Sequence, residues 1–340
     1  MARRGRMIMK MKPEKPKMSD IAKALNISTI SVSRALAGQD GVSDELRRAI
    51  LLKADEMGYL KPRNPVDYKI LVLHQKPFIQ DNSNYSHMLQ GIAQALQKAG
   101  CEYDMEFVDK ESQFSHTLPN KIARGSHYHG VLYIGNFESA YVDFLSQRVQ
   151  NHVLYTGYSP SADSDCVWYN FNNGAYKQCK YLIQRGHVRI GFAGNSRSYV
   201  GKEKLVGIIS ALEDHDMPVE NDFFICADEG FEEIFYQMIR SGQGPTAIIC
   251  HWDYTAIKLI KYLHEKGLRV PDDLSIIGSG NTEMASLCIP ALTTLELHID
   301  YACETAVALL IKRLGRPEKP AEYIQIGGTL IERDSVKALG

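Results

Sequence analysis

Apolar side chains recur at helical spacing in three short segments near the start of the chain. Serine, a favoured N-cap residue, stands where each segment begins, at Ser19, Ser28 and Ser43. The pattern predicts helices over about 20–25, 29–37 and 44–57. The expected inward-facing positions are Ile21, Ala22, Leu25, Val32, Ala35, Leu36, Leu46, Ile50, Ala54 and Met57. Three helices in roughly 40 residues, the first two tightly joined, indicate a helix-turn-helix unit.

From residue 68 onward, short apolar runs alternate with amphipathic segments. Strands are predicted at 68–75, 102–108, 130–135, 152–157, 166–170, 189–194, 222–227, 246–251, 274–278, 293–297 and 323–327. Helices are predicted at 85–100, 114–125, 138–150, 173–186, 201–215, 231–241, 253–267 and 299–314. Repeated β-α units imply an α/β body with parallel sheets covered on both faces. Two such sets imply two lobes with a ligand crevice at the carboxyl ends of the strands.

The second predicted helix is unusually rich in hydroxyl side chains, which weaken a helix because they compete for backbone hydrogen bonds. We therefore expect the neighbouring helices to hold it in place, leaving its outer face free to contact DNA in the major groove. Ser28, Ser31 and Ser33 are suited to phosphate contacts. The amide end of the helix at Ser28 also attracts anions. The alternative for each serine is capping or simple exposure to solvent.

Three further side chains of this helix are candidates for reading bases. Arg34 has the geometry to bind the two acceptors of a guanine, a contact worth ~1–3 kcal/mol against a wrong base. Thr29 and Ile30, at the exposed start of the helix, are placed to contact base edges and a thymine methyl group. The alternative for Arg34 is a surface ion pair. Taken together on one basic unit, these residues favour DNA contact.

Charge is distributed unevenly along the chain. Residues 1–63 hold 14 Lys/Arg and 7 Asp/Glu, whereas residues 64–340 hold 25 and 33, so that a basic head precedes an acidic body. This asymmetry favours a polyanionic partner for the head. No apolar run is long enough to span a bilayer, and the first residues lack the apolar core of a secretory signal. The seven cysteines form no CxxC pair, which fits reduced thiols in a cytoplasm.

The segment MSDIAKALNISTISVSRALAGQDGVSDELRRAILLKADEMGY (18–59) resembles the DNA-binding head of the lactose/galactose/purine repressor family of bacterial transcriptional regulators. The resemblance rests on DIAKALNIS, SVSRAL, the VS before the third helix and the final GY. The resemblance implies that Thr29, Ile30 and Arg34 read bases and that Ser28, Ser31 and Ser33 line the phosphates. Isoleucine is unusual in this family at the position of Ile30, so the resemblance does not indicate which operator sequence is bound.

The segment after the head departs from the family pattern, which has a hinge helix that wedges a leucine into the minor groove. Here only LKPRNPVD lies between Tyr59 and the first strand of the body. Pro62 and Pro65 disfavour helical geometry at the residues before them. We therefore expect a short extended linker at 61–67. Lys61 and Arg63 are candidates for contacts with the DNA backbone or minor groove, with simple solvation as the alternative.

The resemblance continues in the body, at YLIQRGHVRIGFAGN, PTAIIC, GLRVPDDLSIIG and PALTTLEL. It implies a two-lobed effector-binding and dimerisation domain similar to the type I periplasmic binding proteins, with chain crossings near Tyr169, Glu296 and Ile326. The expected organisation is a disordered basic tail at 1–17, a helix-turn-helix domain at 18–60, the linker at 61–67 and the body at 68–336. The expected N-lobe comprises 68–168 and 297–326, and the expected C-lobe 169–295 and 327–336.

The expected crevice departs from the family pattern. The clamping arginine of the family corresponds to Lys204, and the usual GYDD becomes GSGN (278–281), which loses an acidic side chain. The resemblance indicates effector contacts from Tyr85, Ser198, Lys204, Trp252, Asp253 and Asn281. Trp252 and Tyr85 are suited to enclosing a sugar ring, with Lys204, Asp253 and Asn281 bonding its polar edge. The alternative is that Trp252 is part of the core and Lys204 is solvated.

Rival functions find less support in the residues. GSGNTE lacks the third glycine of a dinucleotide motif, and His127 and His129 have no further ligands at metal-site spacing. We expect no cofactor, no metal and no enzymatic activity. The sequence predicts a cytoplasmic homodimeric repressor, nucleoid-associated when bound to a near-palindromic operator, that is controlled by a small-molecule effector and does not bind membranes. A sugar is the favoured effector, and a nucleoside, a purine or no effector at all is the alternative.

Overall fold

The computed structural model describes residues 16–36, 41–57, 59, 68–75, 83–157 and 163–339. The predicted linker with Lys61 and Arg63, and most of the predicted tail, lie outside these residues. Within the described part, no helix has the length and apolar character needed to cross a membrane. The helix-turn-helix head and the α/β body are both present, which confirms the predicted fold class.

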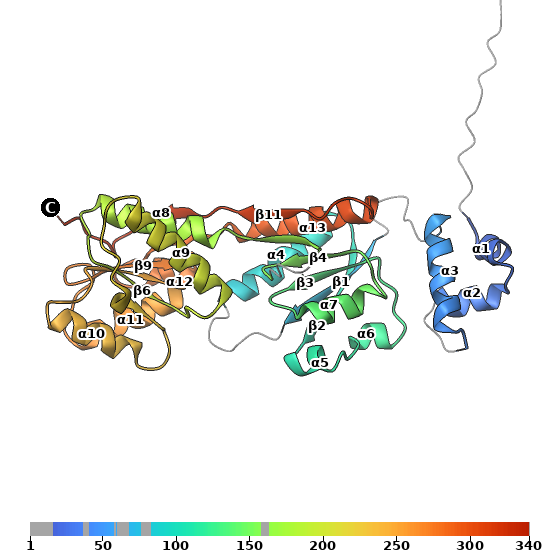
Figure 1. Cartoon of the computed structure of the whole chain (residues 1–340), viewed down its shortest axis with the longest axis horizontal. Helices are drawn as coiled ribbons and strands as arrows, with labels where there is room; N and C mark the ends of the chain where they lie inside the picture. Colours follow the sequence, from blue (N-terminus) through green and yellow to red (C-terminus); the bar gives the residue numbers. More distant parts are fainter. Residues whose placement is uncertain are drawn as a thin grey trace, which may run out of the picture. The chain divides into compact units, whose positions relative to one another are not determined.

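The head consists of α1 (Met18–Leu25), α2 (Thr29–Leu36) and α3 (Asp44–Glu56), shown in blue in Figure 1. Its core contains Ile21, Val32 and Ile50, each fully buried, so that all three helices contribute to one small apolar cluster. The hydroxyl of Ser28 accepts from the Ser31 amide at 3.0 Å, as expected of an N-cap. The cluster and the cap together hold α2, which has little stabilising sequence of its own.

Two local predictions in the head have different outcomes. Ser43 caps α3, accepting from the Leu46 amide at 3.3 Å. The predicted cap at Ser19 is wrong, because α1 begins at Met18, two residues before the predicted start, and Ser19 lies inside it. The N-cap is Lys17, and the Asp20 carboxylate accepts from the Lys17 amide at 2.7 Å.

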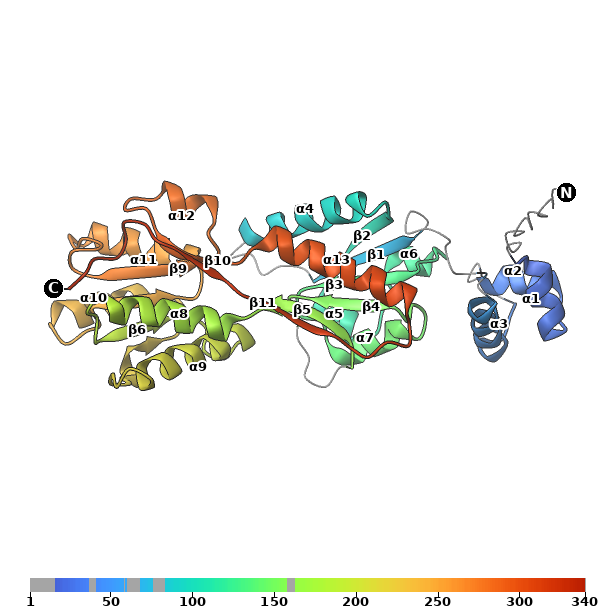
Figure 2. The ribbon, with the colours of Figure 1, turned by 90° about the horizontal axis from the view of Figure 1, so that it is seen from above.

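The first sheet of the body has six strands among the described residues, in the order β11-β5-β4-β3-β1-β2, and its determined pairs are parallel. The strands are β1 (Lys69–Gln75), β2 (Glu102–Val108), β3 (Gly130–Ile134), β4 (His152–Tyr155), β5 (Asp165–Tyr169) and β11 (Tyr323–Ile326). The helices of this part of the chain are α4 (Ser83–Lys98), α5 (Lys110–Phe114), α6 (Asn120–Ala123), α7 (Ser139–Ser146) and α13 (Ile299–Gly315). Figures 1 and 2 show α4 and α13 side by side.

The predicted single helix at 114–125 is wrong. The structure has two short helices there, α5 and α6, and the second begins directly after Pro119. Because proline lacks an amide hydrogen and restricts the residue before it, the chain cannot continue one helix through this point.

The second sheet also has six described strands, in the order β12-β10-β9-β8-β6-β7. They are β6 (Ile190–Ala193), β7 (Phe224–Ile225), β8 (Ala247–Cys250), β9 (Ser275–Ser279), β10 (Thr293–Glu296) and β12 (Thr329–Ile331). The helices are α8 (Phe171–Gln184), α9 (Tyr199–Glu213), the 3-10 turn η2 (Asn221–Phe223), α10 (Phe231–Arg240), α11 (Asp253–Glu265) and α12 (Glu283–Leu287). The short elements β12 and α12 were not predicted. β12 runs antiparallel to β10, so the expectation of a wholly parallel sheet is wrong at this edge.

Strand β8 illustrates how the second sheet is buried. All four of its residues are inaccessible to solvent. Ala247 and Ile249 pack with the core beneath α8 and α9, whereas Ile248 and Cys250 pack with the core beneath α10 and α11. Figure 1 shows these helix pairs on opposite faces. The alternation follows from the two-residue period of a strand, and burial on both faces is typical of parallel sheets.

The chain passes from the first sheet to the second after β5, returns after β10, and passes to the second again after β11. The division of the chain into compact units is different from the division into sheets. One unit contains the head helices and β1–β3, and the other contains β5 together with the second sheet. The lobe boundaries given above therefore stay a prediction.

Candidate functional site

The outer face of α2 gathers the side chains that the sequence singled out for DNA contact. Ser28, Thr29, Ile30, Ser33 and Arg34 are exposed, and Ser31 is half-buried. Ile30 is 63% exposed, which is a high value for an isoleucine in a folded helix. Its burial would stabilise the head, so its exposure indicates a surface that is available to a partner.

Arg34 has no ion-pair partner among the residues that the structure describes. No described carboxylate forms an ion pair with it, so the alternative of a surface ion pair is not observed. Its guanidinium lies near the loop before α3, because a Cβ placed on Gly41 would come within 3.1 Å of Nη1. Arg47 by contrast donates to the Ala35 carbonyl at 3.1 Å and joins α3 to α2. Among the described residues, Arg34 is thus an exposed cation with no carboxylate partner, whereas Arg47 has a structural role.

The predicted effector residues of the second sheet come together at the carboxyl ends of β6, β8 and β9. Ser198 follows β6, Trp252 and Asp253 follow β8, and Asn281 follows β9. Lys204 reaches the same place from α9. The topology of a parallel sheet places these loops at one edge, where ligands of open α/β folds bind.

Lys204 lies at the centre of this group and is fully buried. Its Nζ donates to Ser279 Oγ at 2.8 Å and to the main-chain oxygen of His251. The ring centroid of Trp252 is 4.9 Å from Nζ and that of Phe171 is 5.8 Å away. Burial lowers the pKa of Lys204 to about 7. The alternative that Lys204 is solvated is therefore wrong.

Most of the other predicted contacts are already engaged by the protein. The Asp253 carboxylate accepts from Thr294 Oγ1 and from the Thr282 amide, and burial raises its pKa. Ser198 caps α9, its hydroxyl accepting from the Gly201 amide at 3.0 Å and donating to a main-chain oxygen. These bonds explain the placement of both side chains, so their roles in binding an effector stay predictions.

Asn281 is held on both sides. Its Nδ2 donates to Glu296 at 2.6 Å, and its Oδ1 accepts from Arg333 at 2.6 Å. It therefore links the end of β9 to the segments around β10 and β12. Its role as an effector contact also stays a prediction.

The two predicted aromatic contacts lie on different elements. Trp252 is half-buried, stacks on His251 at 4.9 Å with an interplanar angle of 27°, and meets Phe171 edge to face. Tyr85 lies in the first turn of α4 and is half-buried, and burial raises its pKa to about 12. The side chain of its neighbour Asn84 lies close to Gly280, at the end of β9. A Cβ placed on Gly280 would come within 2.6 Å of Asn84 Nδ2.

Three residues that the sequence did not single out complete the surroundings of Lys204. They are Phe171 and Gln178 of α8 and His251 after β8. The Gln178 amide donates to the main-chain oxygen of Gly278 at 2.6 Å and to Ser279 Oγ at 3.3 Å. Nothing in the local pattern of α8 distinguishes Phe171 and Gln178 from the other residues on its buried face.

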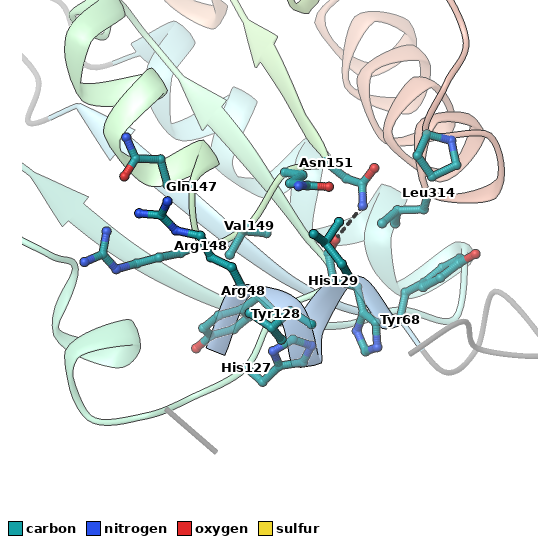
Figure 3. Close-up of a pocket in the computed structure, with 14 residues that line it drawn as sticks. Arg48, Tyr68, His127, Tyr128, His129, Gln147, Arg148, Val149, Asn151 and Leu314 are labelled. Atoms are coloured by element: carbon teal, nitrogen blue, oxygen red, sulfur yellow. Dashed lines mark hydrogen bonds between the residues drawn. The ribbon is translucent and has the colours of Figure 1, made fainter. Parts of the chain in front are cut away.

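A separate pocket of about 490 Å³ lies in another part of the chain. Figure 3 shows residues of the body that line this pocket, among them Tyr68, Tyr128, Arg148, His127 and His129. Asn151 donates to the main-chain oxygen of His129 at 3.3 Å there. None of the predicted effector residues lines this pocket, and the described residues contain no group of side chains able to hold a metal ion.

A helix-turn-helix head joined to a body with two largely parallel sheets defines a class of protein, the DNA-binding regulators with a ligand-binding domain. Comparisons with known proteins agree. Residues 179–336 match the family model of the periplasmic binding protein-like domain. The HTH-type transcriptional repressor PurR of Photobacterium profundum is 25% identical over 340 residues, covering 95% of this chain and 99% of that protein.

Solved structures share the fold. The transcriptional regulator CelR in its cellobiose complex covers 94% of this chain and 99% of its own, with 19% identity and a TM-score of 0.67. The lac repressor dimer bound to operator and the anti-inducer ONPF covers 96% and 100%, with 19% identity and a TM-score of 0.66. The chain is thus similar along nearly its whole length to HTH-type transcriptional repressors, and these relatives support a role as a transcriptional regulator.

Proposed function

We propose that the head binds an operator with α2 in the major groove. In this arrangement Arg34 bonds a guanine, Thr29 and Ile30 contact neighbouring base edges, and the serines bond phosphates. The single observation that carries the proposal is the exposed face of α2. On this face the exposed Arg34, which has no ion-pair partner among the described residues, and the exposed Ile30 lie over a buried core. Lys61 and Arg63 are proposed to contact the DNA backbone or minor groove close by. We also propose that the protein acts in the cytoplasm, as binding to an operator would require.

The operator is first obtained by selection from a random duplex library with the full chain. Fluorescence anisotropy then compares the selected duplex with a scrambled one. Arg34→Ala is expected to reduce the discrimination between the two by about 1–3 kcal/mol, or roughly 5- to 150-fold. Arg48→Ala, an exposed arginine of α3 off the α2 face, is the matched control, because it removes the same charge. Full discrimination by Arg34→Ala would refute the assignment of α2.

We propose that the active form is a homodimer that binds a near-palindromic operator. One head covers only a half-site, and two heads related by a twofold axis reach successive major grooves about one turn apart. The dimeric, operator-bound lac repressor, which shares the fold, supports this arrangement. Inserting half a turn of DNA between the selected half-sites is expected to weaken binding strongly, and inserting a full turn to weaken it less. Binding that is insensitive to the spacing would indicate independent heads.

We propose that a small molecule, most simply a carbohydrate, binds at the carboxyl ends of β6, β8 and β9 and alters affinity for the operator. The cellobiose complex of CelR supports the carbohydrate class. A purine or nucleoside is the second candidate. The effect of the ligand on operator binding cannot exceed the difference between its binding free energies for the DNA-bound and DNA-free forms of the protein, commonly ~1–3 kcal/mol. Thermal-shift screening against sugars, sugar phosphates, nucleosides and purines, followed by operator binding with each hit, tests the proposal. Hits that leave operator affinity unchanged contradict it.

A further inference from the structure

The ammonium group of Lys204 is buried and has no direct ion-pair partner among the described residues. Its hydrogen-bond acceptors, Ser279 Oγ and the main-chain oxygen of His251, are neutral. No carboxylate in the described part of the chain forms an ion pair with it. The rings of Trp252 and Phe171 cover the group, and aromatic faces offset only part of the cost of removing an ammonium ion from water.

The nearby carboxylate of Asp253 raises the pKa of Lys204, but by less than burial lowers it. The carboxylate of Asp253 is turned toward its own donors, Thr294 and Thr282. Burial raises the pKa of Asp253 and that of the Cys250 thiol. His251 has a pKa lowered to about 3 by burial and is neutral near pH 7.

His251 adds a second unused donor to the cluster. Its Nδ1 accepts from the Asn195 amide at 3.2 Å, so in the neutral ring the proton is on Nε2. This N–H is buried and has no hydrogen-bond partner. The same ring stacks on Trp252, whose indole lies over the Lys204 ammonium. A cation and an unsatisfied N–H therefore flank one half-buried indole ring at the ends of β8 and β9.

We propose that the effector carries an anionic group, a phosphate or a carboxylate, that binds Lys204 and His251. The inference rests on the proposed effector control and narrows the carbohydrate to a sugar phosphate or a sugar acid. The anion supplies a direct ion-pair partner for Lys204 and the acceptor that His251 Nε2 lacks, since charge-assisted bonds to phosphate or carboxylate are the strongest available to these donors. The ligand enters on the side of Trp252, the half-buried member of the aromatic cover, and its apolar ring face stacks on the indole.

Isothermal titration of the full chain at pH 7 tests this with glucose 6-phosphate, gluconate, inorganic phosphate, acetate and neutral glucose as probes. At least one anionic probe is expected to bind at least ~10-fold more tightly than glucose. The phosphate and carboxylate arms show which anion fits. Lys204→Met is expected to weaken anion binding by ~30-fold or more, because it removes one partner of a buried charge pair.

Two further variants keep the experiment decisive. Lys202→Met removes an exposed lysine from the same helix and is expected to leave the affinity within about 2-fold, as for a surface charge. Lys204→Arg keeps the charge and is expected to retain the preference for anions. The inference is overturned if glucose binds as tightly as the anionic probes, if no anionic probe binds, or if Lys204→Met binds them unchanged. Operator binding by the unliganded wild-type chain is measured in parallel, and its loss would refute the proposed function instead.

Discussion

The buried ammonium of Lys204 makes the stability of the protein depend on pH in a defined window. Burial lowers the pKa of this group from 10.5 to about 7. Between these values the unfolded chain carries the proton and the folded chain does not, so the free energy of unfolding increases as pH rises. At ~1.4 kcal/mol per pH unit, the increase between pH 7 and 9 is about 3 kcal/mol. Below pH 7 the group is charged in both the folded and the unfolded state. The full cost of burying the charge, of the order of 5 kcal/mol, then lowers the free energy of unfolding.

Lys204→Met keeps an unbranched apolar stem, one atom shorter than lysine, and removes the charge. The substitution loses two hydrogen bonds, worth ~1 kcal/mol each, and avoids the larger cost of the buried charge. At pH 6 the variant is therefore expected to be more stable than wild type by ~1–3 kcal/mol. Between pH 7 and 9 this advantage is expected to shrink by about 3 kcal/mol.

Urea unfolding followed by far-ultraviolet circular dichroism at pH 6, 7, 8 and 9 measures the difference. Circular dichroism is preferred to tryptophan fluorescence because Trp252 contacts the mutated side chain. Lys202→Met, an exposed position on the same helix, is expected to follow the wild-type profile. Parallel pH profiles for wild type and Lys204→Met, or a variant less stable than wild type at pH 6, would refute the reasoning.

Three other substitutions test separate parts of the structure. Gly207→Ala places a Cβ 2.1 Å from the Asn172 main-chain oxygen where α9 packs on α8, so a loss of ~1–3 kcal/mol is expected in urea unfolding, whereas the exposed Val206→Ala changes it by less than ~0.5 kcal/mol. Ser28→Ala removes the cap of α2 and is expected to cost the head ~1 kcal/mol, measured by hydrogen exchange of the 18–56 amides with Ser33→Ala as control. Trp252→Ala is expected to abolish the thermal shift produced by effector hits, and an unchanged response to every ligand would remove this residue from the site.

The head could be predicted closely from sequence because its determinants are local. Helical spacing identified Ile21, Val32 and Ile50 as core positions, and all three are fully buried. The caps at Ser28 and Ser43 follow from side chains that bond amides three residues away. The prediction at Ser19 was wrong because Asp20, one position further on, forms a competing bond to the Lys17 amide.

The strands of the body were predictable, but the sheet edge was not. Apolar runs located every long strand, since a buried parallel strand is apolar on both faces. The three-residue β12 carries too little pattern to be recognised. Its antiparallel pairing with β10 depends on where the returning chain meets the sheet, which no local pattern encodes.

The sequence by itself determined that the chain has a hydroxyl-rich second helix held by its neighbours and a β-α body, because side-chain period and caps act over a few residues. Only the tertiary structure decided that Lys204 is buried, since its acceptor Ser279 is 75 residues away and its ring contacts come from two further elements. The engagement of Asn281 by Glu296 and Arg333 was decided in the same way. Charge and hydrogen-bond satisfaction in an interior depend on which distant groups meet there, and folding alone brings those groups together.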